Sequence, residues 1–283
     1  MENRYLSGIG RVDLRIEEEI FGKRSELLRY KGNPAFAKAM KKQESKNLDS
    51  IGDCWAFLVE NPDMRTRFYQ GEIDEETVKR EGEKGKAAAR KAWDYLSRIA
   101  PTGSLIVNSL TPNVLKELNK IVLGREANAE HNFRNFDIVS GSSLNYSPPS
   151  YKSIEHLVKN FISRIPEIYK RNPLVAGIYS HFTLFCIRPF DDGNKKVARL
   201  IGDRILSDAG MTPAIIAGGE GNFYYKLFCD AANACGEESA SNVDNRGWRE
   251  KVDLFFDYIA SKVNNSLDEA LKDLQKNNFF NKF

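Results

Sequence analysis

The stretch that decides the fold of this 283-residue chain runs from His181 to Arg204 and reads HFTLFCIRPFDDGNKKVARLIGDR. An apolar segment leads into Pro189-Phe190, a tight turn follows at 191–193, and apolar residues then return at helical spacing. We therefore predict two helices joined by a short loop. The backbone N–H groups from Gly193 to Lys196 would point outward at the positive end of the second helix dipole, which suits phosphate oxygens.

The side chains around this helix start favour the same ligand. Lys195 and Lys196 lie four and three residues before Arg199, so one phosphate could meet several cations. Asp192 lies beside the expected anion site and could hold Mg²⁺ between two phosphates. Asn194 could cap the helix or bond a phosphate oxygen. The alternative is a helix stop, a turn and a solvated charged face without a ligand.

Most of the remaining chain also shows helical periodicity. Apolar residues follow the i, i+3, i+4, i+7 pattern from Ile154 to Ile165 and from Val252 to Val263. Shorter runs of the same kind occur at 114–122 and 197–205, and Thr111-Pro112 opens the first of them. The chain is therefore predicted to be mainly α-helical.

One segment breaks this pattern and predicts a β-hairpin. Apolar and polar residues alternate from Phe136 to Ile138 and from Leu144 to Tyr146, on either side of a Ser-Gly-Ser-Ser turn, and Pro148-Pro149 ends the unit. An isolated hairpin leaves an edge of unpaired backbone groups. We therefore expect residues 136–146 to dock an extended segment of a protein target by strand addition.

Composition excludes several classes of protein. A hydrophobic fraction of 41% is enough for a core, and 42 Lys and Arg against 39 Asp and Glu leave a net charge of +3, too small to predict a nucleic-acid partner. The four cysteines have no zinc-binding spacing and are expected to be reduced. Because neither a signal peptide nor a membrane span is visible, we expect a protein that is cytoplasmic where it is made, with export into a host cell as an effector left open.

Residues 188–199 resemble the motif of the Fic (fido) family, H-P-F-x-[DE]-G-N-G-R-x-x-R. In this chain they read RPFDDGNKKVAR, and His181 precedes them by seven residues. The surroundings are similar too, with Leu110-Thr111-Pro112 before a helix and Phe133-Arg134 before the hairpin. The resemblance implies a Fic-type helical core at 105–262 with the hairpin as a target-docking flap. An N-terminal helical extension at 1–104 and a C-terminal helix and tail at 263–283 would flank that core.

The resemblance also implies a chemistry. Known members bind a nucleotide, usually ATP with Mg²⁺, and most transfer AMP to a hydroxyl of a protein. By position, Asp192 resembles the metal ligand, and Arg199 resembles the arginine that binds the γ-phosphate. Gly193, Asn194 and the following backbone of Lys195 and Lys196 resemble the anion hole.

Three positions depart from the family pattern. Arg188 stands where the catalytic His is expected, Lys195 replaces a Gly and Lys196 replaces an Arg. That His accepts the proton of the attacking hydroxyl, which a permanently charged arginine cannot do. A Lys at position 195 resembles the Doc branch, which transfers the γ-phosphate. His181 lies about 10 Å of helix before Arg188, and we prefer a structural histidine there over a substitute base.

Many family members carry an inhibitory helix with the pattern [ST]-x-x-x-E-[GN], whose Glu pairs with the last Arg of the motif. Thr77 to Gly82 reads TVKREG and matches it, so the resemblance implies an inhibitory helix near 77–99 with Glu81 facing Arg199. The alternative is a solvated helix face rich in charges.

Three functions remain open at this point. The first is a degenerate Fic protein that binds a nucleotide or a protein partner but transfers AMP poorly, because of Arg188. The second is an active nucleotide-dependent transferase with altered chemistry, favoured by the retained Asp192, Gly193, Asn194 and Arg199. The third is an active AMP transferase into which Arg188 was introduced to trap it.

Overall fold

The computed structural model describes residues 9–52, 62–125, 132–138, 146–237 and 246–280. Among these residues every regular element is a helix, so the mainly α prediction is confirmed. The α-helices and 3₁₀ turns, in chain order, are α2 (Leu14–Leu28), α3 (Pro34–Ile51), α5 (Pro62–Tyr69), α6 (Glu75–Ile99), η1 (Ile106–Asn108), α7 (Pro112–Val122), η2 (Tyr151–Ser153), α8 (Ile154–Arg171), α9 (Pro173–Ile187), α10 (Asn194–Asp208), η3 (Gly218–Glu220), α11 (Gly221–Glu237) and α12 (Arg246–Phe280).

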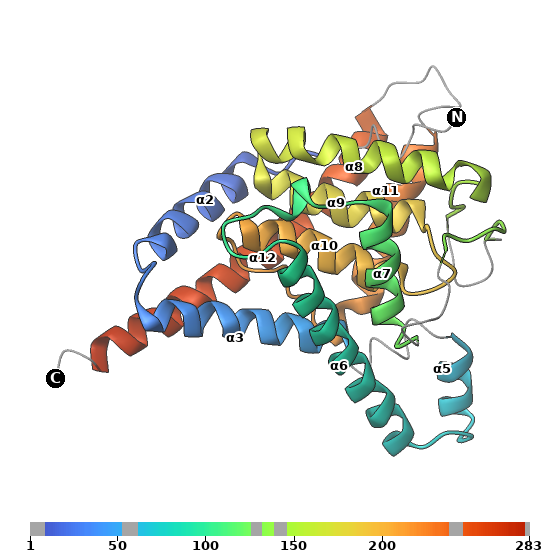
Figure 1. Cartoon of the computed structure of the whole chain (residues 1–283), viewed down its shortest axis with the longest axis horizontal. Coiled ribbons are helices and arrows are strands. Elements are labelled where there is room, and N and C mark those ends of the chain that lie inside the picture. Colours follow the sequence, from blue (N-terminus) through green and yellow to red (C-terminus); the bar gives the residue numbers. More distant parts are fainter. Residues whose placement is uncertain (1–8, 53–61, 126–131, 139–145, 238–245, 281–283) are drawn as a thin grey trace.

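Helix α9 lies at the centre of the molecule, with α10 packed along it (Figure 1). Every residue from Ala176 to Ile187 is buried, as expected of a helix that is apolar on all sides. Its start is well defined, because the side chain of Asn172 accepts a hydrogen bond from the N–H of Val175 and Pro173 holds the first helical position. The centre of the fold therefore sits directly before the Arg188 to Arg199 segment.

Two glycines let α9 and α10 approach each other closely. A Cβ atom added at Gly202 would lie 2.8 Å from the carbonyl oxygen of Gly177 and 2.9 Å from Cβ of His181. A Cβ atom at Gly177 would lie 2.7 Å from Cγ of Leu206. These distances are shorter than van der Waals contact, so the crossing of the two helices requires the absence of side chains at both positions.

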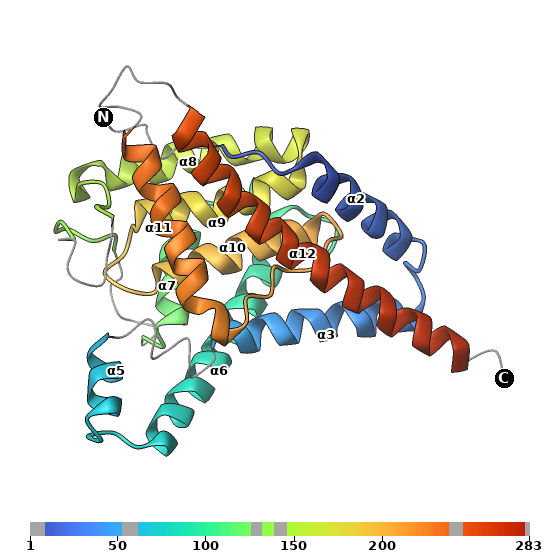
Figure 2. The ribbon, with the colours of Figure 1, turned by 180° about the vertical axis from the view of Figure 1, so that it is seen from behind.

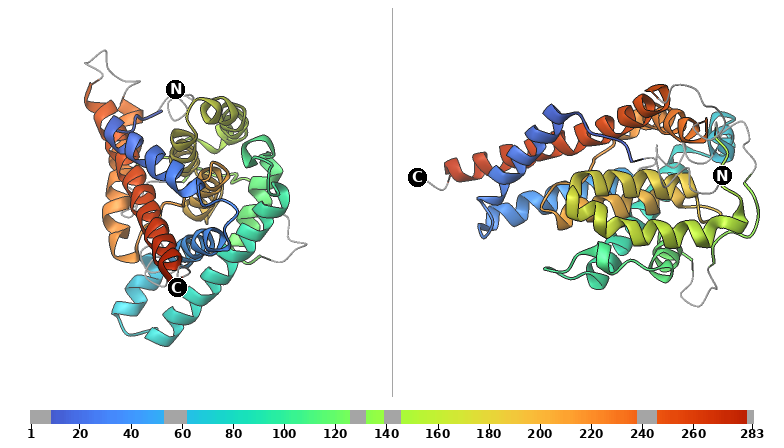
Figure 3. Two further views of the ribbon diagram at one scale, coloured as in Figure 1. Left: turned by 90° about the vertical axis from the view of Figure 1, so that its left-hand side faces the viewer. Right: turned by 90° about the horizontal axis from the view of Figure 1, so that it is seen from above.

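The outer helices cover this centre from two sides. Helix α12 runs across one face beside α2, α3 and α11, and α7 with part of α6 covers the opposite face (Figures 2 and 3). Two ion pairs join α3 to α12, from Lys42 to Asp273 at 2.7 Å and from Lys46 to Glu269 at 2.6 Å. The predicted division between residues 262 and 263 falls inside the continuous helix α12.

The predicted β-hairpin is not confirmed. Residues 139–145 lie outside the described part of the chain, and the flanking residues 136–138 and 146–149 form no strand. Tyr146, which the alternating pattern placed on the hairpin, is buried, and its hydroxyl donates a hydrogen bond to the carbonyl of Phe185 at 2.9 Å. Packing of this tyrosine against the central helix therefore decides its conformation.

Two other expectations are met within the described residues. Cys186, Cys229 and Cys235 are buried and form no disulfide with one another. None of the described helices is both long enough and apolar enough to cross a membrane.

We predict that Gly202→Ala lowers the free energy of unfolding by about 1–3 kcal/mol, because the new methyl group would overpack the α9–α10 crossing. Urea unfolding measures this change. Gly22→Ala is the matched control, since a Cβ atom at that position in α2 meets nothing within 4 Å. The control should gain roughly 0.5–1 kcal/mol from helix propensity. A Gly202→Ala protein as stable as the parent would contradict the close crossing.

Candidate functional site

The loop between α9 and α10 begins with an unusual backbone conformation. Arg188 has φ 44° and ψ 65°, and it is the one non-glycine residue with positive φ in the described part of the chain. Its N–H donates to the carbonyl of Leu184 at 3.1 Å and so closes the last turn of α9. The left-handed conformation costs roughly 1–2 kcal/mol for a residue with a Cβ atom, so the surrounding contacts must hold it in place.

Hydrogen bonds from the side chains of Asn194 and of Asn119 fix the shape of this loop. The side chain of Asn194 accepts from the N–H of Phe190 and donates to its carbonyl, each at 2.9 Å. Asn119 of α7 donates to the carbonyl of Asp192 at 2.8 Å. The side chain of Asn194 therefore closes the loop and does not cap the helix. Its expected role toward a phosphate is left to its backbone N–H in the first turn of α10.

The start of α10 has the features of an anion site. Gly193 precedes the helix with φ 74°, and no side chain caps the first turn. A Cβ atom at Gly193 would lie 2.7 Å from Nδ2 of Asn119, so this position requires glycine. Lys195 and Lys196 are half-buried beside the helix start. Backbone N–H groups at the positive end of a helix dipole, with cations next to them, favour phosphate or carboxylate.

Asp192 is exposed next to this helix start, and its carboxylate accepts the N–H of Gly193 at 2.6 Å. Asp191, its neighbour, forms an ion pair with Arg125 at 2.7 Å. Among the described residues no group of three or more metal-ligating side chains is found. Mg²⁺ in proteins commonly uses one or two carboxylates together with substrate phosphates. Asp192 fits that mode of binding, in which most ligands come from the nucleotide and from water.

Arg199 is buried, and helix α3 holds it. Its Nη2 donates to Oγ of Ser50 at 2.7 Å and to Oδ1 of Asn47 at 3.5 Å. The pocket at this point has a volume of about 20 Å³ and is lined in part by Ser50, Lys195, Arg199 and Tyr224. Such a volume holds about one water molecule. In this arrangement the pocket beside Arg199 is too small for a phosphate group.

Glu81 and Arg199 each bond to other residues and not to one another in the described structure. Glu81 forms ion pairs with Lys84 at 2.7 Å and with Arg80 at 3.9 Å, both on its own helix α6. The first part of α6 extends away from the body of the protein beside α5 (Figure 1). In the described structure the expected pairing of Glu81 with Arg199 is therefore absent: Glu81 pairs within α6, and Arg199 bonds Ser50 and Asn47 of α3.

His181 is a buried core residue. Its side chain is buried between α11 and α12, where Nε2 shares a hydrogen bond with the hydroxyl of Tyr224 at 2.8 Å and the ring packs on Phe255. Burial, with a smaller effect of the charges of Arg199 and Lys195, lowers the pKa of His181 to about 3. The imidazole is therefore neutral, but it cannot meet a substrate hydroxyl without a rearrangement of the core.

Sequence reasoning missed a second buried charge, Asp203 of α10. Its Oδ1 accepts the N–H of Ala214 and its Oδ2 accepts Nδ2 of Asn47, both at 2.9 Å. Asn47 thus bonds both Asp203 and Arg199, which lie one turn apart on α10. Burial raises the pKa of Asp203 to about 6, against the opposing effect of Arg199. The signal in the sequence was the Arg199-to-Asp203 spacing of four residues within an apolar helix.

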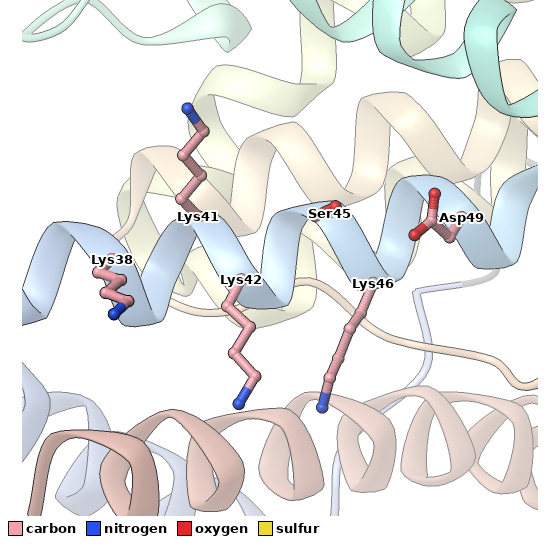
Figure 4. Close-up of a pocket in the computed structure, with 6 residues that line it drawn as sticks. All are labelled: Lys38, Lys41, Lys42, Ser45, Lys46 and Asp49. Atoms are coloured by element: carbon pink, nitrogen blue, oxygen red, sulfur yellow. The ribbon is translucent and has the colours of Figure 1, made fainter. Parts of the chain in front are cut away.

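A larger pocket, of about 510 Å³, lies along α3 and is lined mainly by lysines (Figure 4). Lys42 and Lys46 point toward α12, where Asp273 and Glu269 pair with them, whereas Lys41 points to the other side. Its lysines therefore do not converge on one ligand. The loop and helix start at residues 188–199 remain the better candidate site.

Comparisons with known proteins show which family and fold this chain resembles. A model of the Fic/DOC family matches residues 109–206. The protein adenylyltransferase Fic of Nematostella vectensis is 31% identical over 128 residues, which is 44% of this chain and 29% of that relative's length. A Fic-domain-containing signaling protein from Bacteroides thetaiotaomicron aligns with a TM-score of 0.65 and 16% identity, over 92% of this chain and 97% of that one. Fic-1 from C. elegans has the same TM-score and identity, over 93% and 73%. At such identity these structures show a shared fold.

We predict that Asp203 makes the protein less stable as the pH rises from 4 to 7. The folded pKa of about 6 lies above the unfolded value near 3.8, so the protonated carboxyl is favoured in the folded state, and that advantage is lost as the pH passes through 6. In Asp203→Asn this dependence disappears. Urea unfolding measures the free energy of unfolding of both proteins at pH 4 and at pH 7. Between these pH values, the free energy of unfolding of Asp203→Asn should rise relative to that of the parent by about 1–3 kcal/mol. A constant difference between the two proteins would mean that Asp203 titrates normally.

Proposed function

The chain carries a Fic/DOC-family domain, related to protein AMP transferases, and from this premise we propose that it binds ATP with Mg²⁺ at the start of α10 but transfers AMP poorly. The observation that carries the proposal is the combination of an anion-binding helix start with Arg188 at the position of the family's catalytic histidine. The first feature supports binding, and the second argues against efficient transfer.

The binding half of the proposal rests on the geometry around Gly193. The loop shape is fixed by Asn119 and Asn194, which holds the first-turn N–H groups of α10 in one orientation and supports their assignment to phosphate oxygens. Lys195 and Lys196 add positive charge, and Asp192 offers one carboxylate to Mg²⁺. We assign the nucleotide phosphates to this helix start.

The transfer half of the proposal rests on proton chemistry. A hydroxyl that attacks a phosphate must lose its proton, and a base within hydrogen-bond reach has to accept it. The guanidinium of an arginine such as Arg188 has only N–H donors and no acceptor atom for this proton. Its Nε is buried and finds no partner among the described residues. The guanidinium is therefore suited to contact a phosphate oxygen and unsuited to activate a nucleophile.

We further propose that α3 limits access to Arg199. A γ-phosphate at this arginine must replace Ser50 and Asn47 as its hydrogen-bond partners. Support comes from the small volume of the pocket lined by Ser50, Lys195 and Arg199. Inhibition by Glu81, which the resemblance implies, is the alternative to this proposal, and the same binding experiment tests it. Docking of a protein target at residues 136–146 also stays a prediction.

The second candidate function is an active transferase that moves AMP or phosphate to a target hydroxyl. The retained Asp192, Gly193 and Arg199 favour it, because these residue types position a nucleotide in the family. It requires a base other than Arg188. The burial of His181 under Tyr224 and Phe255 argues against that residue.

We predict that ATP with Mg²⁺ binds to the protein, and that Asp192→Ala combined with Arg199→Ala weakens binding at least tenfold. The reason is the loss of a metal ligand and of charge-assisted hydrogen bonds to phosphate, which contribute about 1.5–3 kcal/mol. Isothermal titration calorimetry measures the affinity. Ser50→Ala should tighten binding about fivefold, because Arg199 loses a competing acceptor worth about 1 kcal/mol.

Glu81→Ala serves as the comparison for Ser50→Ala. Unchanged affinity is expected, because Glu81 pairs with residues of its own helix. If Glu81→Ala tightens binding and Ser50→Ala does not, α6 rather than α3 limits access to the site. If the parent protein binds no nucleotide at all, the phosphate-site proposal is wrong.

We predict that Arg188→His restores AMP transfer, by about 10²–10⁴-fold over the parent, because the imidazole can accept the hydroxyl proton. Incubation with isotope-labelled ATP and a cell lysate, followed by mass spectrometry, reports the transferred group and its target. The double variant with Lys195→Gly tests whether the lysine side chain also obstructs the nucleotide. A parent protein that already turns over at an ordinary enzymatic rate would refute the impaired-transfer proposal.

A further inference from the structure

Arg134 lies in the connection after α7, and it is a buried cation near the site with several hydrogen bonds to the backbone. Its side chain is fully buried, and its three nitrogens donate to three backbone carbonyls. Nε donates to the carbonyl of Arg188 at 2.8 Å, Nη1 to that of Phe136 at 2.8 Å, and Nη2 to that of Pro149. In addition, its backbone N–H donates to the carbonyl of Pro189 at 2.9 Å.

The three carbonyls belong to two parts of the chain, residues 136–149 and residue 188. Phe136 and Pro149 lie at the two ends of the 136–149 segment, and Arg188 begins the loop of the candidate site. Asp137 joins the same two ends, because its Oδ1 accepts the N–H of Tyr151 at 2.7 Å. Asp137 also lies 3.8 Å from the guanidinium and is its acidic neighbour. One planar guanidinium therefore connects both ends of this segment to residue 188.

The bond to Arg188 bears on its strained backbone. Residue 188 is left-handed although it carries a large side chain. The direction of its carbonyl depends on ψ, and that carbonyl is held by Nε of Arg134. A hydrogen bond from a charged donor in a buried position is among the stronger ones in proteins. Arg134 thus supplies a restraint of the kind that a strained conformation needs in order to persist.

We propose that Arg134 is a positioning residue. It holds the left-handed backbone at residue 188 and so ties the direction of that side chain to both ends of the 136–149 segment. The importance of this direction for transfer rests on the proposed function, whereas the backbone restraint itself does not. A guanidinium is needed for this role, because a lysine ammonium cannot place three donors in one plane.

The test is a double-mutant cycle that combines Arg134→Lys with Arg188→Gly. Glycine adopts positive φ without a steric penalty, so Arg188→Gly in the parent should raise the midpoint temperature of unfolding by about 2 °C. If Arg134 maintains the strained conformation, its loss lets residue 188 relax. The gain from Arg188→Gly should then fall below half in the Arg134→Lys background.

Arg204→Lys is the matched control. Arg204 is also a buried arginine with several acceptors, namely Asp208, Ser97 and the carbonyl of Ala100, but it lies away from the loop. Arg204→Lys should lower the midpoint temperature of unfolding. Arg188→Gly should nevertheless raise that temperature by the same amount in the Arg204→Lys background as in the parent. Equal gains in the parent and Arg134→Lys backgrounds, or an equal reduction by Arg204→Lys, would overturn the proposal.

A second measurement applies if Arg134→Lys folds poorly. In Arg134→Gln, hydrogen exchange detected by mass spectrometry should accelerate together at 146–152 and at 184–190, with exchange elsewhere unchanged. Faster exchange at only one of the two regions would contradict a shared restraint. Neither measurement involves ATP, so failure of this proposal is distinguishable from failure of nucleotide binding.

Discussion

The contact of α9 with α10 through Gly177 and Gly202 is the constraint on which the rest of the structure depends. The chain between these two closely packed helices reverses within residues 188–193. Left-handed backbone is found at both ends of this reversal, at Arg188 and at Gly193. The start of α10, and with it the candidate anion site, lies directly after this turn. The chemistry of the site thus depends on packing several turns away.

The contact of α3 with α10 is made by polar side chains, in contrast to the glycine contact of α9 with α10. Gln43, Asn47 and Ser50 follow one stripe of α3, and the first two are fully buried. Asn47 bonds Arg199 and Asp203, but the side-chain amide of Gln43 finds no partner among the described residues. Burying polar groups adds little net stability, and an unsatisfied one reduces it. This stripe of α3 therefore covers Arg199 less tightly than an apolar stripe would.

The sequence predicted the parts of the fold that depend on local pattern. Apolar spacing identified α7, α8, α10 and α12, and the Thr111-Pro112 pair correctly marked the start of α7. The loop at 188–193 was also expected, because Pro, Asp and Gly interrupt two apolar runs. Periodicity failed where a tertiary contact decides the outcome, as for Tyr146, which alternates like a strand residue and is held by Phe185. The partners of Arg199 were missed for the same reason, since Ser50 and Asn47 lie about 150 residues earlier in the chain.

The contacts of helix α12 determine which parts of the molecule assemble late. It is the last described element, yet α2 and α3 near the other end of the chain pack directly on it. Their ion pairs join residues more than 220 positions apart. Contacts at such separation form late, both in refolding and during synthesis on the ribosome. The 188–199 segment is complete before α12 exists, so the candidate anion site at the start of α10 is made first and its cover by α3 becomes secure only afterwards.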